Sequence, residues 1–216
     1  MALSDLFKSR RKADESDTDT GPTDGRVYPS RALAKFLASL SAKSQPVLLD
    51  LGPVVGQNVS FFGEQLGCKI FVENLCKDID RHVRDAKLEE MPAFFEKRFP
   101  QEDASVDGVL CWDVLDYLDK ASAQAVAKQL ARILRPDGAL LAMFMATAPA
   151  TPPRAEYTRY VVIDQATLQY RPYAATRGKQ RPMLNRDIEL MFQPLRVTEQ
   201  FLLKNNLREV LFRKPK

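Results

Sequence analysis

The sequence predicts an α/β fold: a Rossmann-like doubly wound sheet, mostly parallel, that ends in an antiparallel hairpin. Short apolar runs alternate with helical segments from residue 47 to residue 146, as in parallel strands joined by crossover helices. Gly52 and Gly56 stand where the first apolar run turns into a helix, as in nucleotide-binding α/β units. Near the C-terminus, Asn205 and Asn206 join two apolar runs, and tandem Asn suits a tight hairpin.

The elements of the alternating region follow from their apolar spacing. Ser30 is a candidate N-cap for a first helix, whose apolar residues recur every three or four positions from Leu33 to Leu40. Short apolar runs predict buried strands at 47–51, 69–73, 107–112 and 139–146. Helical patterns lie between them at 58–66, at 76–98 with a break near Met91-Pro92, and at 120–134, and a tight turn is expected at 135–138.

The pattern changes after residue 146. A Pro-rich stretch at 148–153 is followed by aromatic and β-branched residues at strand-like spacing over 157–173. A short helix is expected at 184–192, and the closing hairpin at 196–203 and 207–213.

Length and composition favour one domain. The chain has 216 residues, 45% of them apolar, so we expect a single folded domain over 26–216. Residues 1–25 are polar and charged, which predicts a flexible tail. No apolar run approaches the ~20 residues of a membrane span, and no signal peptide is visible. Cys68, Cys76 and Cys111 lack disulfide or metal spacing, so we expect no metal and a cytoplasmic protein.

Charge is distributed unevenly. Residues 151–216 hold 13 basic and 6 acidic residues, a net charge of +7, although the whole chain carries only +4. A basic surface can face a polyanion or an anionic substrate. No nucleic-acid-binding motif accompanies it, so a solvated surface is the favoured interpretation and nucleic acid stays an alternative partner.

Two acids at strand ends point to a nucleotide site. Asp50 ends the first strand and precedes the Gly52–Gly56 turn, where the backbone can approach a ligand closely. Glu73 ends the second strand 23 residues later, and an acid there can accept two hydrogen bonds from a ribose diol. Asp50 as a turn cap and Glu73 as a surface acid are the structural alternatives.

Four successive motifs resemble those of class I S-adenosylmethionine-dependent methyltransferases of the type 11-like group. They are VLLDLGPVVG, KIFVENL, SVDGVLCWDVLDYLD and ILRPDGALLAMF, in that order between Pro46 and Phe144. The terminal hairpin is similar to the antiparallel strands six and seven of the family. The resemblance implies S-adenosyl-L-methionine as cofactor and methyl transfer as the activity.

The resemblance also implies roles for individual residues. Asp50 and Gly52 would form the loop beneath the methionine part of the cofactor, with Gly56 at the helix entry. Pro53, also counted among the cofactor-binding residues, departs from the family pattern and stiffens this loop. Glu73 would hold the ribose hydroxyls, and Asn74 would lie near the adenine. The loop after the fourth strand would face cofactor and substrate; its residues are Cys111, Trp112 and Asp113.

Several residues depart from the family pattern or have structural alternatives. Val54 replaces the middle glycine of the loop, and no Asp before Phe99-Pro100 matches the adenine-side acid. Tyr117 takes the usual His position. The motif CWDVL differs from the type that methylates amino groups of DNA bases or of glutamine. Trp112 could be core packing and Asp113 an N-cap.

The residues outside the four motifs are less specific. His82, the only histidine, lies among charged residues and is predicted to be solvated on a helix surface. Cys68 and Cys76 are expected to be structural. The tyrosines of the aromatic segment could line a substrate pocket or cover a sheet; they are Tyr157, Tyr160, Tyr170 and Tyr173.

The leading functional hypothesis is methyl transfer to a small-molecule acceptor. The resemblance places residues 151–183 near the cofactor mouth, as a substrate-facing insertion. A catalytic base is not identified; if the acceptor is a hydroxyl, Asp113 or a tyrosine is a candidate. The alternatives are a non-catalytic module with the same fold and an RNA methyltransferase. A nicotinamide-dependent oxidoreductase is disfavoured because G-x-G-x-x-G is absent after the first strand.

Overall fold

The computed structural model describes residues 25–148 and 154–216. Residues 1–24 of the predicted tail lie outside these ranges, as do residues 149–153 of the Pro-rich stretch. Among the described residues, no helix is long and apolar enough to cross a membrane.

A six-stranded sheet forms the centre of the fold, in the order β3-β2-β4-β5-β9-β8. The first four strands pair in parallel, and β9 and β8 are antiparallel. This confirms the predicted fold class. The strands are β2 (Val47–Asp50), β3 (Lys69–Val72), β4 (Val106–Trp112), β5 (Leu134–Met145), β8 (Arg196–Leu202) and β9 (Leu207–Arg213).

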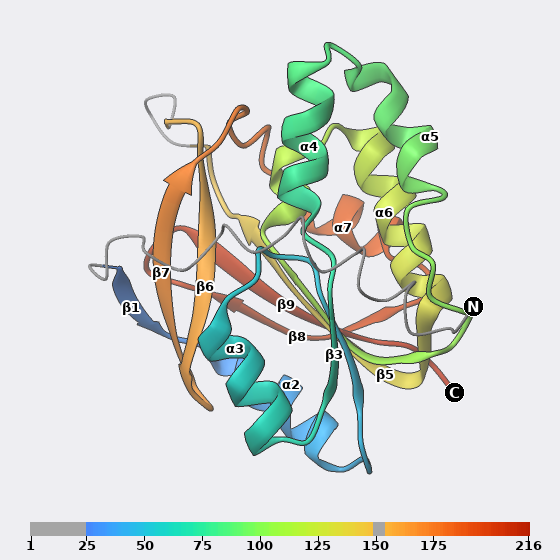
Figure 1. Cartoon of the computed structure of the whole chain (residues 1–216), viewed down its shortest axis with the longest axis vertical. Helices are drawn as coiled ribbons and strands as arrows, with labels where there is room; N and C mark the ends of the chain where they lie inside the picture. Colours follow the sequence, from blue (N-terminus) through green and yellow to red (C-terminus); the bar gives the residue numbers. More distant parts are fainter. Residues whose placement is uncertain (1–24, 149–153) are drawn as a thin grey trace, which may run out of the picture.

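Helices cover both faces of this sheet (Figure 1). On one face lie α4 (Leu75–Arg84), α5 (Met91–Phe95), α6 (Lys120–Ile133) and α7 (Asn185–Met191), and on the other lie α2 (Arg31–Ser41) and α3 (Gly56–Ser60). The α3 helix continues as a π-helical turn, η1 (Phe61–Gln65), and short 3-10 helices stand at η2 (Leu88–Glu90) and η3 (Val114–Tyr117).

Alternating strand residues supply two apolar cores, one on each face. Leu49, Val109 and Leu140 pack with α4, α5, α6 and α7. Their neighbours Leu48, Leu110 and Leu141 pack with α2 and η1. Because side chains alternate along a strand, strands buried on both faces have continuous apolar sequences. This is why the apolar runs identified them.

A second sheet contains three antiparallel strands in the order β1-β7-β6. It is built from β6 (Glu156–Asp164), β7 (Thr167–Ala174) and β1 (Arg26–Pro29). The β6–β7 hairpin arises from the segment with strand-like aromatic spacing. The β1 strand was not predicted, because four residues carry little periodicity and its partner β7 is remote in sequence.

Local features confirm some predictions and correct others. Ser30 caps α2 by accepting a hydrogen bond from the Leu33 amide. The predicted turn at 135–138 is instead an irregular start of β5, with Asp137 at φ +62°. The break in the 76–98 segment comes before α5, which begins at Met91.

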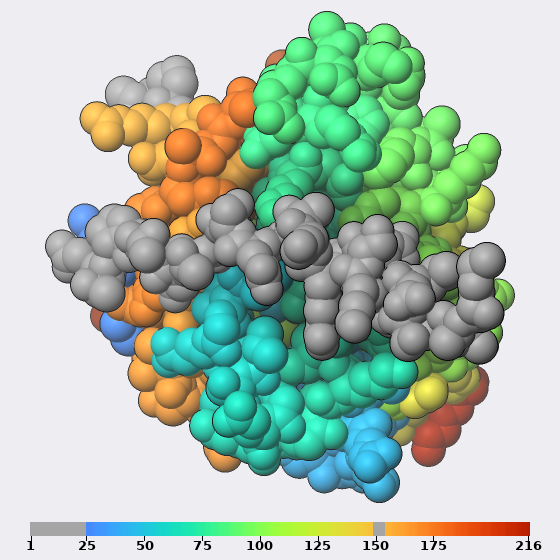
Figure 2. All heavy atoms as spheres, viewed as in Figure 1, coloured from blue at the N-terminus to red at the C-terminus, as the bar shows by residue number. Residues whose placement is uncertain are grey.

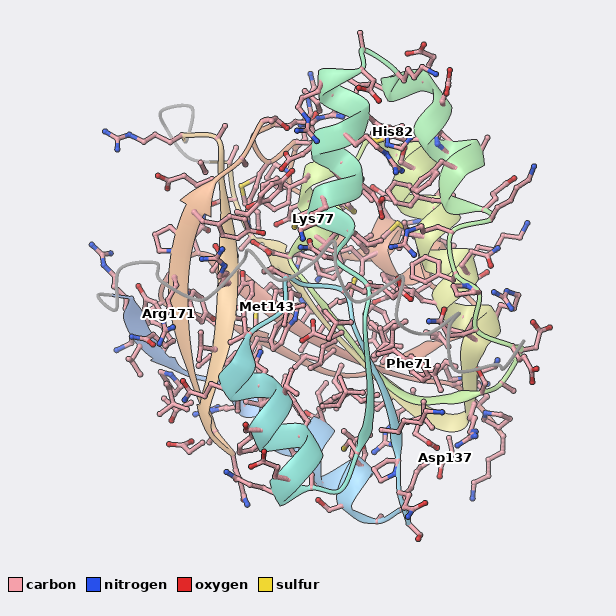
Figure 3. The ribbon with its side chains drawn as sticks, in the orientation of Figure 1. Phe71, Lys77, His82, Asp137, Met143 and Arg171 are labelled. Atoms are coloured by element: carbon pink, nitrogen blue, oxygen red, sulfur yellow. The ribbon has the colours of Figure 1, made fainter. Side chains whose placement is uncertain are left out.

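His82 is buried, so the prediction of a solvated histidine was wrong. Only 7% of its surface is exposed, and its Nδ1 lies 2.7 Å from the Asp78 carbonyl oxygen. Its ring packs against Phe94 at a centroid distance of 4.7 Å, and Figure 3 shows it between α4 and α5. Leu75, Ile79 and His82 share the buried face of α4, a spacing that outweighs the charged neighbours.

Candidate cofactor and acceptor site

The predicted site residues meet at the carboxyl ends of three adjacent strands. The β2 strand lies between β3 and β4. The chain therefore adds β3 on one side of β2 and β4 on the other, which makes this a point where the strand order switches. Open α/β sheets bind ligands outside the strand ends at such a switch point. Asp50, Glu73 and Trp112 stand at or next to these three ends.

Asp50 organises the glycine turn. Its Oδ1 accepts hydrogen bonds from the Gly52 amide at 2.9 Å and from Trp112 Nε1 at 2.7 Å. Burial raises the pKa of Asp50 to about 6, while these two donors act in the opposite direction. The capping role considered for Asp50 is therefore present, together with a link to β4.

The Trp112 side chain covers the glycine turn. A Cβ placed on Gly52 would lie 3.0 Å from Trp112 Cδ1 and 3.2 Å from Nε1. The indole also stacks on Tyr160 of β6, with centroids 5.0 Å apart and planes 7° from parallel. Trp112 adopts φ +50°, which is rare for a bulky residue and is typical of functional sites. Trp112 is thus buried packing at the centre of the site.

Glu73 is held by two side chains from the segment after α5. Its carboxylate accepts hydrogen bonds from Arg98 at 2.6 Å and from Gln101 at 3.1 Å. Its amide donates to the Asp50 carbonyl at 2.7 Å, which fixes the two strand ends together. The side chain stays 18% exposed. Glu73 is an anchored carboxylate rather than a free surface acid.

The other predicted cofactor residues occupy different environments. Asn74 caps α4 by accepting from the Lys77 amide at 3.3 Å. Pro53 is buried, whereas the surroundings of Gly56 are open, with no atom within 4 Å of a Cβ placed there. Cys111 is fully buried within β4, and burial raises its thiol pKa. Cys111 therefore contributes packing and its backbone.

Two acids and a lysine form a buried cluster directly after β4. Lys179 Nζ lies 2.6 Å from Asp113 Oδ2 and 3.2 Å from Asp116 Oδ2. Sequence reasoning singled out Asp113 but missed Asp116 and Lys179. Asp116 lies within the DVLDYLD motif, but Lys179 comes from a distant loop with no local signal. We call Asp113, Asp116 and Lys179 the acid–lysine cluster.

The three-stranded sheet is fastened to the switch-point region. Asn58 of α3 donates to the Tyr160 carbonyl at 2.8 Å and accepts from the Val162 amide at 2.8 Å. On the opposite side, Tyr157 donates to Asp80 of α4 at 2.9 Å. Figure 2 shows the orange β7 region against the green α4 surface. The aromatic segment therefore lies over the strand ends as well as covering a sheet.

The raised pKa of Asp50 makes a prediction for stability. A carboxyl whose pKa is higher in the folded protein than in the unfolded chain binds its proton more tightly when folded. Asp50 therefore adds stability as pH falls from 7 towards 4, by up to about 3 kcal/mol. Asp50→Asn cannot titrate. We expect Asp50→Asn to be most stable relative to wild type at pH 7. This difference in the free energy of unfolding, variant minus wild type, should become smaller as the pH falls towards 4. Urea unfolding at several pH values tests this, and a constant difference contradicts it.

A known family model matches the part of the chain that contains this arrangement. Residues 49–142 match the family model described as methyltransferase domain. The matched stretch, which is less than half of the chain, is similar to a methyltransferase domain. The matched range contains the glycine turn, Glu73 and the end of β4, and enzymes of this family use S-adenosylmethionine as methyl donor. No curated protein is significantly similar to the chain.

Solved structures share the fold of this chain. An S-adenosylmethionine-dependent methyltransferase from Clostridium acetobutylicum aligns over 99% of this chain and 99% of its own, at 11% identity and TM-score 0.51. The 1,6-didemethyltoxoflavin-N1-methyltransferase of Burkholderia thailandensis, solved with S-adenosylhomocysteine, aligns over 99% and 87%, at 14% identity and TM-score 0.50. The cyclase SpnF aligns over 85% and 80%, at 11% identity and TM-score 0.51. At these identities the likeness shows the fold alone.

Proposed function

We propose that the chain transfers a methyl group from S-adenosylmethionine to a small-molecule acceptor. The observation that carries this proposal is the pairing of the Asp50–Gly52 turn with Glu73 at adjacent strand ends, beside the switch point. The cofactor supplies a sulfonium methyl as the electrophile. The protein then has to align donor and acceptor and keep water away.

The nucleoside end of the site fits this cofactor. Glu73 is fixed in position by Arg98 and Gln101 and retains exposed carboxylate surface. A carboxylate fixed there can accept hydrogen bonds from both ribose hydroxyls. Asn74, next in the chain, stands at the start of α4 beside the place assigned to adenine.

The methionine end requires one change. Trp112 occupies the face of Gly52 against which the methionine part would lie. Rotation of the indole away from Asp50 would break one hydrogen bond and the stack on Tyr160. It would free one acceptor position on Asp50 Oδ1, which would still accept from the Gly52 amide. The glycine turn itself needs no rearrangement.

Two tyrosines near the site are disfavoured as a base. Burial raises the pKa of Tyr160 and of Tyr173 well above the usual value, which makes a tyrosinate costly at either position. Of the two candidates for a base, Asp113 and a tyrosine, Asp113 is therefore favoured. It is held by Lys179, so it would act only when that ion pair opens.

Calorimetry with S-adenosylhomocysteine tests the proposal. The wild-type chain is expected to bind one equivalent. Trp112→Phe keeps an aromatic ring but lacks the Nε1 donor to Asp50, a bond to a charged group worth about 1.5–3 kcal/mol. We expect Trp112→Phe to bind S-adenosylhomocysteine about tenfold more tightly, because the ring can move without breaking a hydrogen bond to Asp50.

A second candidate function, a non-catalytic module, is favoured by one observation, the indole over Gly52. That function predicts no binding heat for wild type or for Trp112→Phe at millimolar ligand, which would overturn the enzymatic proposal. Weaker binding by Trp112→Phe would instead show that the indole is part of the cofactor site.

A further inference from the structure

The acid–lysine cluster has an unusual balance of charge and hydrogen bonds. Asp116 is fully buried and Asp113 is 4% exposed, yet one ammonium serves both carboxylates. Asp116 Oδ2 also accepts from the Met145 amide at 2.7 Å. Among the described residues, Asp116 Oδ1 has no hydrogen-bond partner. A buried carboxylate oxygen without a partner is costly and calls for an explanation.

The lysine that forms ion pairs with these two acids comes from outside the core sheet. Lys179 belongs to the segment 175–184 between β7 and α7, which has no helix or strand. Burial alone would lower the pKa of Lys179, but Asp113 and Asp116 outweigh this and raise it. A Cβ placed on the neighbouring Gly178 would meet no atom within 4 Å. The backbone therefore has open space at Gly178, one residue before Lys179.

A cavity lies along the same segment and begins at Gln180, the residue after Lys179. It measures about 570 Å³ and lies between the start of α6, the segment 180–183 and α7. Leu118, Ala123, Met183 and Met191 line it together with charged residues, which are Asp119, Lys120, Arg181 and Asp187. Gln180 also lines the cavity, and its backbone N–H donates a hydrogen bond to the Asp116 backbone carbonyl at 2.6 Å. Cavities of this size suit small organic ligands.

We infer that Asp113 and Asp116 form a subsite for the ammonium group of an amine-bearing methyl acceptor, and that Lys179 occupies this subsite in the absence of acceptor. The Lys179 ammonium, on its flexible alkyl stem, shows how a primary alkylammonium would meet both carboxylates. The acceptor's apolar part would extend into this cavity as the segment 175–184 withdraws. This inference rests on the proposed function, because the acceptor site is placed beside the cofactor at the end of β4.

Butylammonium binding to the full chain tests the subsite, with uncharged n-butanol as the matched control ligand. Wild type is expected to bind n-butylamine saturably, as measured by calorimetry or NMR titration, and not n-butanol. Lys179→Ala removes the internal competitor and should bind at least about tenfold more tightly. Asp116→Asn should weaken binding in either background. Equal responses to the two ligands, or no saturable binding by wild type, would overturn the inference even if Lys179→Ala fails to fold.

Saturating S-adenosylhomocysteine separates the acceptor subsite from the cofactor's own amino group. The inference predicts that butylammonium still binds when S-adenosylhomocysteine is bound. Loss of butylammonium binding under these conditions would assign the carboxylates to the cofactor and overturn the inference. Butylammonium binding by a chain that binds no S-adenosylhomocysteine would support the amine subsite and contradict the proposed methyl transfer.

Discussion

Glu73→Gln is expected to weaken S-adenosylhomocysteine binding by about 10- to 100-fold. Hydrogen bonds to a charged group contribute about 1.5–3 kcal/mol, and a neutral amide accepts the ribose diol less well than a carboxylate. One amide oxygen would also have to satisfy Arg98. Calorimetric titration of the variant against wild type measures the change.

Asp78→Asn is the matched control for this prediction. Arg98 bridges Glu73 at 2.6 Å and Asp78 at 2.7 Å, so Asp78→Asn weakens the same ion-pair network without touching the proposed ribose acceptor. We expect Asp78→Asn to bind S-adenosylhomocysteine within about threefold of wild type, less than 1 kcal/mol. Equal losses in both variants would mean that Glu73 acts only by holding the segment after α5.

Phe36→Ala is expected to lower the free energy of unfolding by about 3–5 kcal/mol. Phe36 is fully buried on α2 and belongs to the core that packs on Leu48 and Leu110. A Cβ added to Gly108 would lie 2.9 Å from the Phe36 ring, so glycine at that position lets the ring rest on β4. Truncation removes apolar contact and leaves a cavity.

Leu202→Ala provides the control for Phe36→Ala. Leu202 is 74% exposed at the end of β8, so its truncation should change the free energy of unfolding by no more than about 0.5 kcal/mol. Urea unfolding of both variants measures the two values. Similar destabilisation of the two variants would contradict the assignment of the α2 core.

Much of the fold could be predicted from the sequence because each strand or helix shows its own pattern of apolar residues. Strands buried on both faces leave continuous apolar runs, and the acids that end β2 and β3 follow those runs directly. The prediction for His82 failed because charged neighbours were given more weight than the helical period, although Leu75, Ile79 and His82 follow that period.

The contacts that define the site could not be predicted in the same way. Trp112 meets Asp50 across 62 residues, and Lys179 reaches Asp116 across 63. Tyr160 covers Trp112 because β6 and β7 form a separate sheet with β1. Such pairings depend on how whole elements pack, and no local pattern of residues encodes them.

The most direct test is a crystal structure of the chain with S-adenosylhomocysteine. Ribose hydroxyls on the Glu73 carboxylate, with the Trp112 indole turned away from Asp50 and the amino acid end of the ligand against Gly52, are the predicted result. A ligand bound elsewhere, with the Trp112–Asp50 and Arg98–Glu73 contacts intact, would contradict the proposed cofactor site.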